Sequence, residues 1–81
     1  MARKVHVAVI GAGYWGTKLI SEYLALSREL DYVKLSAVID ISKERLKQVA
    51  KRFNLSHITL CTELSTVLND DSIDAVHIAT P

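Results

Sequence analysis

Apolar positions along this chain follow two spacings, and the changes between them divide the sequence into strands and helices. Residues 5–10 form a short, β-branched and almost continuously apolar run, typical of a strand buried on both faces of a parallel sheet. Residues 33–39 are again rich in β-branched residues and predict a second strand, which ends at Asp40. A longer segment with helical spacing separates the two runs.

That segment begins at Tyr14, and we expect it to form a helix that ends near Leu30. Its apolar residues recur every three or four positions, as on one stripe of a helix. They are Trp15, Leu19, Tyr23, Leu26 and Leu30. Because Trp15 belongs to this stripe, we interpret it as a core residue.

The second half of the chain continues the alternation with shorter elements. Ser42 can cap a helix through its hydroxyl group, and the buried face of that helix is predicted to contain Leu46, Val49, Ala50 and Phe53. Residues 57–61 predict a third strand, Thr62 is expected to cap a short helix, residues 69–72 have turn chemistry, and residues 75–79 predict a fourth strand. Strands that alternate with helices indicate an α/β fold with parallel pairing and right-handed crossovers.

Three glycines occupy the junction between the first strand and the first helix. Residues 11–16 read Gly-Ala-Gly-Tyr-Trp-Gly, which is the GxGxxG pattern in its informative strand-to-helix context. There Gly11 makes the tight turn, Gly13 lets the backbone approach a pyrophosphate, and Gly16 lets the helix pack closely on the strand. Helix amides and the helix dipole attract the phosphate. A glycine-rich turn that binds no ligand is the alternative interpretation.

The acidic residue at the end of the second predicted strand supports the nucleotide interpretation. Asp40 follows Gly16 by 24 positions and can accept hydrogen bonds from an adenosine ribose. It favours NAD, because its charge repels the 2′-phosphate of NADP. Lys43 or Arg45 could reach that phosphate and would favour NADP. A solvated strand end or a helix cap is the other interpretation of Asp40.

The composition of the chain limits which binding partners and which cellular compartment we expect. The 81 residues are 49% hydrophobic and carry a net charge of +1, which gives no reason to expect nucleic acid or an acidic membrane surface. No stretch approaches the roughly 20 apolar residues that cross a bilayer, and no metal-ligand spacing occurs. Cys61 is the single cysteine, so an intrachain disulfide is excluded. We expect a soluble, cytoplasmic protein.

Three stretches together resemble the start of the glucose–fructose oxidoreductase/inositol dehydrogenase family, Gfo/Idh/MocA. They are VAVIGAGYWG at 7–16, the acid of AVID at 37–40, and DSIDAVHIATP at 71–81, and the resemblance spans the whole chain. It implies binding of NAD, or of NADP, through a set of residues that includes the glycine turn, the ribose-binding acid and the end of the fourth strand. These are Gly11, Gly13, Tyr14, Trp15, Gly16, Asp40, Ala79, Thr80 and Pro81.

We therefore predict that residues 1–81 are the N-terminal part of a dinucleotide-binding Rossmann domain, with four parallel strands in the order 3-2-1-4. By resemblance, the full-length enzyme transfers hydride between the nicotinamide and a sugar, cyclitol or related hydroxyl or carbonyl substrate. If nothing followed the fourth strand, its apolar edge would invite pairing with another chain, which would favour a homo-oligomer. The substrate domain, a Glu-Lys-Pro segment and a later histidine of the family would lie after Pro81. A stand-alone, non-catalytic dinucleotide-binding or redox-sensing module is the alternative.

No residue of this chain is a convincing acid–base catalyst. Hydride transfer needs a side chain within hydrogen-bond reach of the substrate hydroxyl, but the three histidines are scattered along the sequence. We interpret His77 as a strand residue with a local hydrogen bond. The chain by itself is therefore expected not to be catalytically competent.

Overall fold

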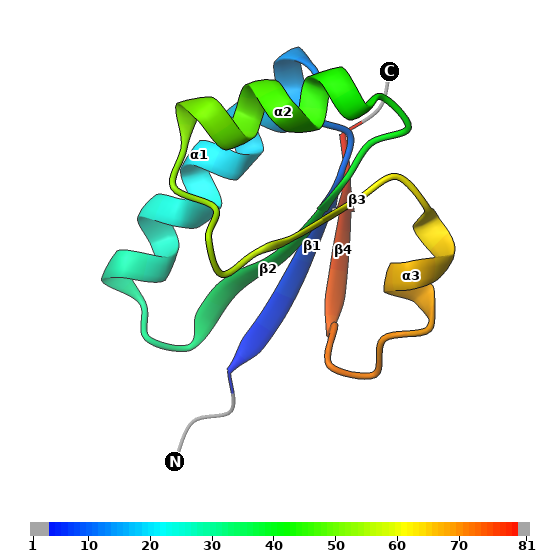
Figure 1. The fold of residues 1–81 in the computed structure, drawn as a ribbon. Coiled ribbons are helices and arrows are strands. Elements are labelled where there is room, and N and C mark those ends of the chain that lie inside the picture. The colour runs from blue at the N-terminus through cyan, green and yellow to red at the C-terminus, as the bar shows by residue number, and fades with distance from the viewer. Residues whose placement is uncertain (1–3, 80–81) are drawn as a thin grey trace.

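The computed structural model describes residues 4–79, which alternate between strands and helices as the sequence predicts (Figure 1). The elements in chain order are β1 (Val5–Ile10), α1 (Tyr14–Glu29), β2 (Val33–Ile39), α2 (Lys43–Arg52), β3 (Thr59–Cys61), α3 (Leu64–Leu68) and β4 (Ala75–Ile78). The bounds of β1 and β2 match the prediction to the residue.

The four described strands form one sheet in the order β3-β2-β1-β4, and every neighbouring pair is parallel. This confirms the predicted α/β class and strand order. The chain moves outward in one direction from β1 to β3 and then returns to the other side of β1 to add β4. In an open α/β sheet, ligands bind outside the carboxyl ends of the strands at the place where the order reverses, which here lies between β1 and β4.

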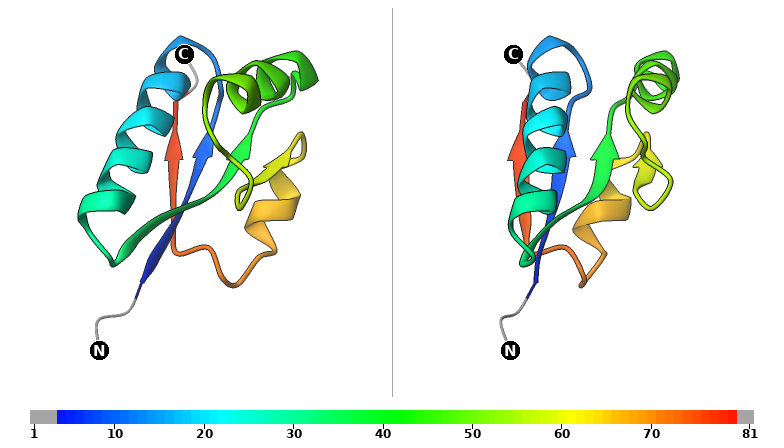
Figure 2. Two further views of the ribbon diagram at one scale, coloured as in Figure 1. Left: turned by 60° about the vertical axis from the view of Figure 1, so that its left-hand side comes forward. Right: turned by 90° about the vertical axis from the view of Figure 1, so that its left-hand side faces the viewer.

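Helices cover both faces of the sheet, in unequal amounts. Figures 1 and 2 show α1 and α2 on one face and α3 on the other. The larger core lies under α1 and α2 and includes the fully buried Val9, Ile20 and Val38. The smaller core lies under α3, around Ala8 and Val67. The apolar composition of β1 follows from this arrangement, because the middle of the strand is buried on both faces.

The first helix is rotated differently from the sequence prediction. Its buried residues are Gly16 and Ile20, whereas Trp15 is 63% exposed, so the prediction that Trp15 is a core residue is wrong. Gly16 packs directly on the preceding turn, which fixes the rotation of the helix about its axis. Since successive residues are about 100° apart around a helix, Trp15 is turned away from the sheet toward its rim.

The second half of the chain deviates from the sequence prediction in smaller ways. The third strand begins at Thr59 rather than at residue 57, and the fourth ends at Ile78 rather than at residue 79. Ser42 does cap α2, because its Oγ accepts a hydrogen bond from the Arg45 amide at 3.2 Å. Thr62, however, does not cap α3.

The residue at the N-cap of α3 is Glu63, one position later, and its side chain makes no capping hydrogen bond. In the second helix, Leu46 and Val49 are buried as predicted, Phe53 is half-buried, and Ala50 is exposed.

Candidate functional site

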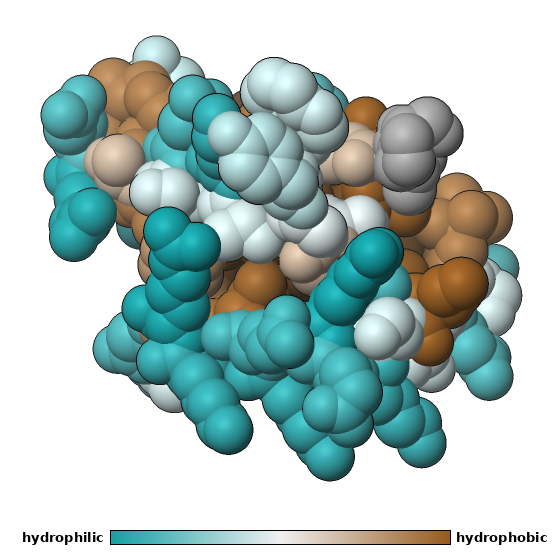
Figure 3. Space-filling model, turned by 90° about the horizontal axis from the view of Figure 1, so that it is seen from above, coloured by the Kyte–Doolittle hydropathy of each residue, from teal (hydrophilic) through white to brown (hydrophobic). Residues whose placement is uncertain are grey.

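The carboxyl ends of β1, β2 and β4 open into one cleft of about 450 Å³. It is lined by residues from the glycine turn, the end of β2, the region after β3 and the end of β4. They are Ile10, Gly11, Gly13, Tyr14, Trp15, Ile39, Asp40, Ile41, Arg45, Thr62, Leu64 and Ala79. Figure 3 views this edge from above, with hydrophilic side chains gathered on the α2 side and hydrophobic atoms exposed elsewhere, at the right of the view.

Two of the three glycines are explained by the geometry of the chain itself. Gly11 has a φ of 103°, a left-handed conformation that L residues with a side chain rarely adopt. Its amide donates to the Ile39 carbonyl at 2.7 Å, which ties the turn to the end of β2. At Gly16, a Cβ would overlap the carbonyl oxygen of Gly11. The two residues therefore allow the sharp turn and the close approach of α1.

The third glycine is not required by the fold. Gly13 has an extended backbone, with φ −79° and ψ −151°. The nearest atoms to a Cβ added there belong to the Arg45 guanidinium, at 3.6 and 3.7 Å, which is ordinary van der Waals contact. Neither backbone strain nor internal overlap therefore requires glycine at position 13, which lines the cleft.

The start of α1 provides hydrogen-bond donors at this place. The first amides of a helix lack intrahelical acceptors, and Gly13, at the N-cap, has no side chain that could accept from them. The first turn of α1 contains no acidic residue, and the carboxylate that lies by the positive end of the helix dipole is that of Asp40, bonded to the Ala12 amide at 2.8 Å. An anion in the cleft would meet both the free amides and this dipole.

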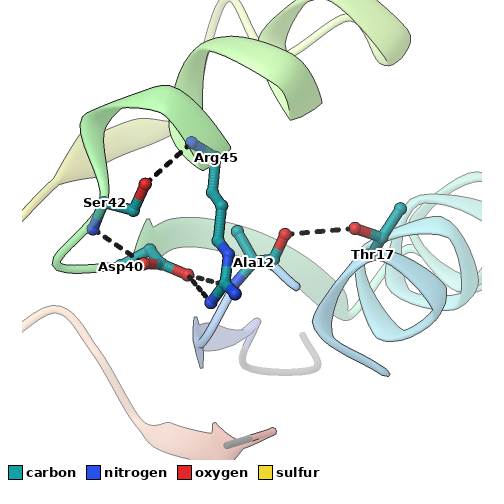
Figure 4. A network of polar contacts seen from close by, with 5 residues as sticks. All are labelled: Ala12, Thr17, Asp40, Ser42 and Arg45. Atoms are coloured by element: carbon teal, nitrogen blue, oxygen red, sulfur yellow. Dashed lines mark hydrogen bonds and ion pairs between the residues drawn. The ribbon is translucent and has the colours of Figure 1, made fainter. Parts of the chain in front are cut away.

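Asp40 connects the turn to α2 (Figure 4). Its carboxylate is 6% exposed, yet Oδ2 accepts from the Ala12 amide and Oδ1 from the Ser42 amide, each at 2.8 Å. Thr17 adds a hydrogen bond from its hydroxyl group to the Ala12 carbonyl at 3.2 Å. The acid therefore fixes the glycine turn as well as bordering the cleft, a role that the sequence did not indicate.

Arg45 completes this network from α2. Figure 4 shows its side chain reaching from the helix toward Asp40 and the turn, and its Nη1 lies 3.8 Å from Asp40 Oδ2. The arginine side chain is 58% exposed, whereas the aspartate side chain is 5% exposed. A half-exposed cation therefore lies at the rim of the cleft beside a buried carboxylate.

Two aromatic residues of the motif stand at the cleft rather than in the core. Tyr14 and Trp15 are 70% and 63% exposed, and their rings meet edge to face with centroids 5.3 Å apart. The ammonium of Lys18 lies 4.5 Å from the Tyr14 ring centroid and 5.0 Å from that of Trp15. These contacts hold both rings beside the start of α1.

The cleft also contains residues that sequence reasoning missed. Ile41, at 91% exposure, directly follows Asp40, and Leu64, at 43% exposure, begins α3. Together with Thr62 they form an apolar wall on the β3 side of the cleft. The available signal was an apolar residue placed directly after a strand end, where a solvated loop would carry a polar one.

The remaining predicted site residues are only partly described. Ala79 lines the cleft, and its amide donates to the Ile10 carbonyl at 2.8 Å. Thr80 and Pro81 lie outside the described residues. None of the three histidines lines the cleft. His77 is a strand residue as predicted, but its contact is not local in the sequence, because its Nδ1 lies 3.0 Å from the hydroxyl oxygen of Tyr23, in α1.

The model of the Gfo/Idh/MocA oxidoreductase family, described as an NAD-binding Rossmann fold, matches residues 5–81. The chain is also 35% identical over 77 residues to the uncharacterized oxidoreductase YgjR of Escherichia coli (strain K12). That alignment covers 95% of this chain but 22% of the relative.

Solved structures give the same result for the fold. GenD2 from gentamicin A biosynthesis, in complex with NAD, has a TM-score of 0.78 and 30% identity, over 100% of this chain and 21% of that one. The WlbA dehydrogenase of Chromobacterium violaceum, in complex with NADH and UDP-GlcNAcA, has a TM-score of 0.72 and 26% identity, over 100% and 22%. The chain thus spans about a fifth of the length of these proteins.

Proposed function

This chain belongs to the Gfo/Idh/MocA family of oxidoreductases and has its NAD-binding Rossmann fold, and we propose how its cleft receives the cofactor. The diphosphate lies against Gly13 and the first amides of α1, held by the turn that Gly11 and Gly16 make possible. The adenosine ribose lies at Asp40, and the nicotinamide extends past Trp15 toward the residues that follow β4.

The observation that carries this proposal is a glycine in the cleft lining, Gly13, that the fold does not require. Nothing within the described residues explains the absence of a side chain there, whereas a diphosphate bound by the neighbouring amides would need that space. The two Asp40 oxygens each have lone pairs left after their bonds to the Ala12 and Ser42 amides. Asp40 can therefore fix the turn and accept ribose hydroxyls at the same time.

The adenine fits the apolar side of the cleft. Ile41 and Leu64 are exposed apolar side chains in a position where a planar ring can cover them. Tyr14 and Trp15 border the cleft from the α1 side. With the phosphate at the start of α1, this places the adenosine half toward β3 and the nicotinamide half toward β4.

The substitution Gly13→Ala tests the phosphate position without disturbing the fold. The added methyl group makes ordinary contact with Arg45, so we expect an unchanged free energy of unfolding. We expect NADH to bind at least about tenfold more weakly, a loss of about 1.4 kcal/mol. Trp15 is the sole tryptophan and lines the cleft, so energy transfer from its fluorescence to NADH reports binding directly.

Unphosphorylated adenosine is the matched control ligand for this experiment. Its binding should be the same in both proteins, because it does not reach the space at Gly13. Equal NADH affinities for the wild type and Gly13→Ala would refute the proposed phosphate position.

For the whole protein, we propose hydride transfer between NAD and a hydroxyl or carbonyl group of a sugar or cyclitol. GenD2 and WlbA, whose structures were solved with NAD and with NADH and UDP-GlcNAcA, support this class. The proton-transfer group would come from outside residues 4–79, since none of the histidines lines the cleft. The stand-alone binding module is the competing function. Steady NADH production by the 81-residue chain, supplied with NAD and a panel of polyols, would contradict the non-catalytic binding module and the placement of the proton-transfer group outside residues 4–79.

We further propose a cytoplasmic location, supported by the single cysteine. Among residues 4–79, no helix is long and apolar enough to cross a membrane. Within residues 4–79, β4 lies at one edge of the sheet and its Val76 and Ile78 are exposed. We propose that this edge pairs with a further strand, either of the same protein or of a second copy in a homo-oligomer.

A further inference from the structure

A groove of about 360 Å³, separate from the cleft, lies at the amino end of the sheet. It is open because β2 pairs with β1 over residues 33–39 but with β3 only over residues 37–39. Within the described residues, the first half of β2 therefore has no strand on its outer side. Figure 1 shows the loop between α2 and β3 descending from α2 toward this end of the sheet, and residues of that loop line the groove.

The groove combines a positively charged rim with an apolar floor. Lys34, His6 and His57 line it, whereas no carboxylate does among its described lining residues. Within residues 4–79, the Lys34 ammonium has no ion pair and no hydrogen bond, so it is available to a ligand. The floor consists of apolar side chains that belong to the larger core or pack against it. They are Leu24, Leu35 and Ile58.

An irregularity in β2 places a hydroxyl group at the same groove. The register between the first two strands shifts between Val7 and Ala8, so that Ser36 is an extra residue in β2. Bulges of this kind redirect side chains and are frequent next to active sites. Ser36 Oγ lies 2.8 Å from His6 Nδ1, and both residues line the groove. The contact therefore holds the His6 imidazole at the border of the groove.

The charged groups around His6 identify Lys34 as the main source of positive charge. His6 also borders a separate groove that contains Asp71 and Asp74, and its backbone amide donates to Asp74 Oδ2 at 2.8 Å. These carboxylates offset the charge that His6 can contribute. Lys34 lines only the groove without carboxylates.

We propose that this groove binds a small aromatic carboxylate. The carboxylate lies at Lys34, and the ring lies on the apolar floor, where the imidazoles of His6 and His57 offer it aromatic contacts. No lining residue of the groove also lines the cleft. The inference is therefore independent of the proposed cofactor site, at the opposite end of the strands.

The experiment follows the backbone amide signals of the chain by nuclear magnetic resonance during titration with benzoate. Acetate and benzyl alcohol are the matched probes, because acetate has the carboxylate without the ring and benzyl alcohol has the ring without the charge. We expect benzoate to bind with a dissociation constant of about 1 mM or lower. It should shift the amides of Ser36 and His57 but not that of Gly13. Each matched probe should bind at least about fivefold more weakly.

Lys34→Gln tests the charge, and Lys4→Gln is its matched control. Lys4 is exposed near the same end of the sheet, but it lines the groove that contains Asp71 and Asp74. Lys34→Gln should weaken benzoate binding about threefold to fivefold, and Lys4→Gln should leave it unchanged. Urea denaturation should show equal stability for both variants and the wild type, since neither ammonium has a partner within the described residues.

Saturating NADH should leave the benzoate affinity unchanged, because the two ligands occupy opposite ends of the sheet. Competition between them would place benzoate in the cleft and overturn the proposal. The proposal would also be wrong if no saturable shifts appeared at Ser36 and His57, if the three probes bound equally, or if the two lysine variants weakened binding equally. Failure of NADH to bind would refute the proposed function alone.

Discussion

Each end of the sheet has an aspartate that accepts hydrogen bonds from backbone amides, and the two differ in what they hold together. At the carboxyl end, Asp40 is buried and bonds to the Ala12 amide, 28 residues away in the sequence. At the amino end, in the loop before β4, Asp70 is exposed and accepts from the amide and hydroxyl of Ser72, two residues away.

The comparison distinguishes an aspartate that only closes a turn from one that helps to build the candidate site. Asp70 closes a local turn of the kind that aspartate forms in many loops, and the loop needs nothing distant to adopt it. Asp40 has a similar local bond, to the Ser42 amide two residues away, but its other bond, to the Ala12 amide, exists only when β1 and β2 are paired. The two Asp70 bonds are therefore local, whereas the Asp40 bond to Ala12 joins distant segments and builds the cleft. Variants at each end make this difference measurable.

The largest effect on stability is expected from a substitution that prevents α1 from packing closely on the glycine turn, at the carboxyl end of the sheet. In Gly16→Ala, the new Cβ would overlap the backbone carbonyl of Gly11, and neither backbone can move without breaking the turn. We expect a loss of about 4 kcal/mol or more in the free energy of unfolding. Urea denaturation followed by circular dichroism measures it. A loss below 1 kcal/mol would mean that the turn relaxes freely and that close packing does not fix the rotation of α1.

A smaller effect is expected from neutralising the buried carboxylate. Asp40→Asn replaces one acceptor oxygen with an NH₂ group that must face a backbone amide, and it leaves Arg45 without its counter-charge. We expect a loss of about 2–4 kcal/mol in stability, together with weaker NADH binding. Urea denaturation measures the loss of stability, and energy transfer from Trp15 to NADH measures the loss of binding.

Asp70→Asn provides the matched control at the other end, since it makes the same chemical change at an exposed local turn. It should leave NADH binding unchanged. Equal losses of stability and binding in the two variants would remove the distinction between the two ends of the sheet.

The smallest effect concerns the pH dependence of the amino-end turn. The Ser72 hydroxyl at 2.6 Å, followed by the Ser72 amide at 2.9 Å, lowers the pKa of Asp70 below its usual value. Because this pKa is lower in the folded state than in the unfolded state, the ionised carboxylate adds stability above the unfolded pKa of about 3.9. The added stability is lost as pH falls through the lowered folded pKa.

Unfolding of the wild type and Asp70→Asn between pH 7 and pH 2.5 tests this assignment. The difference in their free energies of unfolding should be small and favour the wild type at pH 7, and it should shrink in acid. A difference that grew on acidification would show that the sign of the pKa shift is wrong.

Local patterns in the sequence predicted most of the secondary structure of the molecule. The bounds of β1 and β2 and the cap at Ser42 were predicted correctly, because buried strands and caps depend on neighbouring residues. The strand order was also predicted correctly, from the Rossmann fold that the motifs indicate. The position of the glycine turn follows from its spacing for the same reason. The weaker patterns of β3 and α3 gave bounds that were wrong by one or two residues, since short elements take their limits from the surfaces that they pack on.

The tertiary structure decided which way the side chains of the site point. The stripe of α1 suggested that Trp15 is buried, but contact of Gly16 with Gly11 rotates the helix and exposes Trp15 at the cleft. The sequence identified Asp40 as a candidate ligand, but not its bond to Ala12. Pairing of β1 with β2 creates that bond, and the start of α2 after Ser42 brings Arg45 beside it. Periodicity specifies which residues share an element, whereas the contacts between elements set the rotation and the distances that form a site.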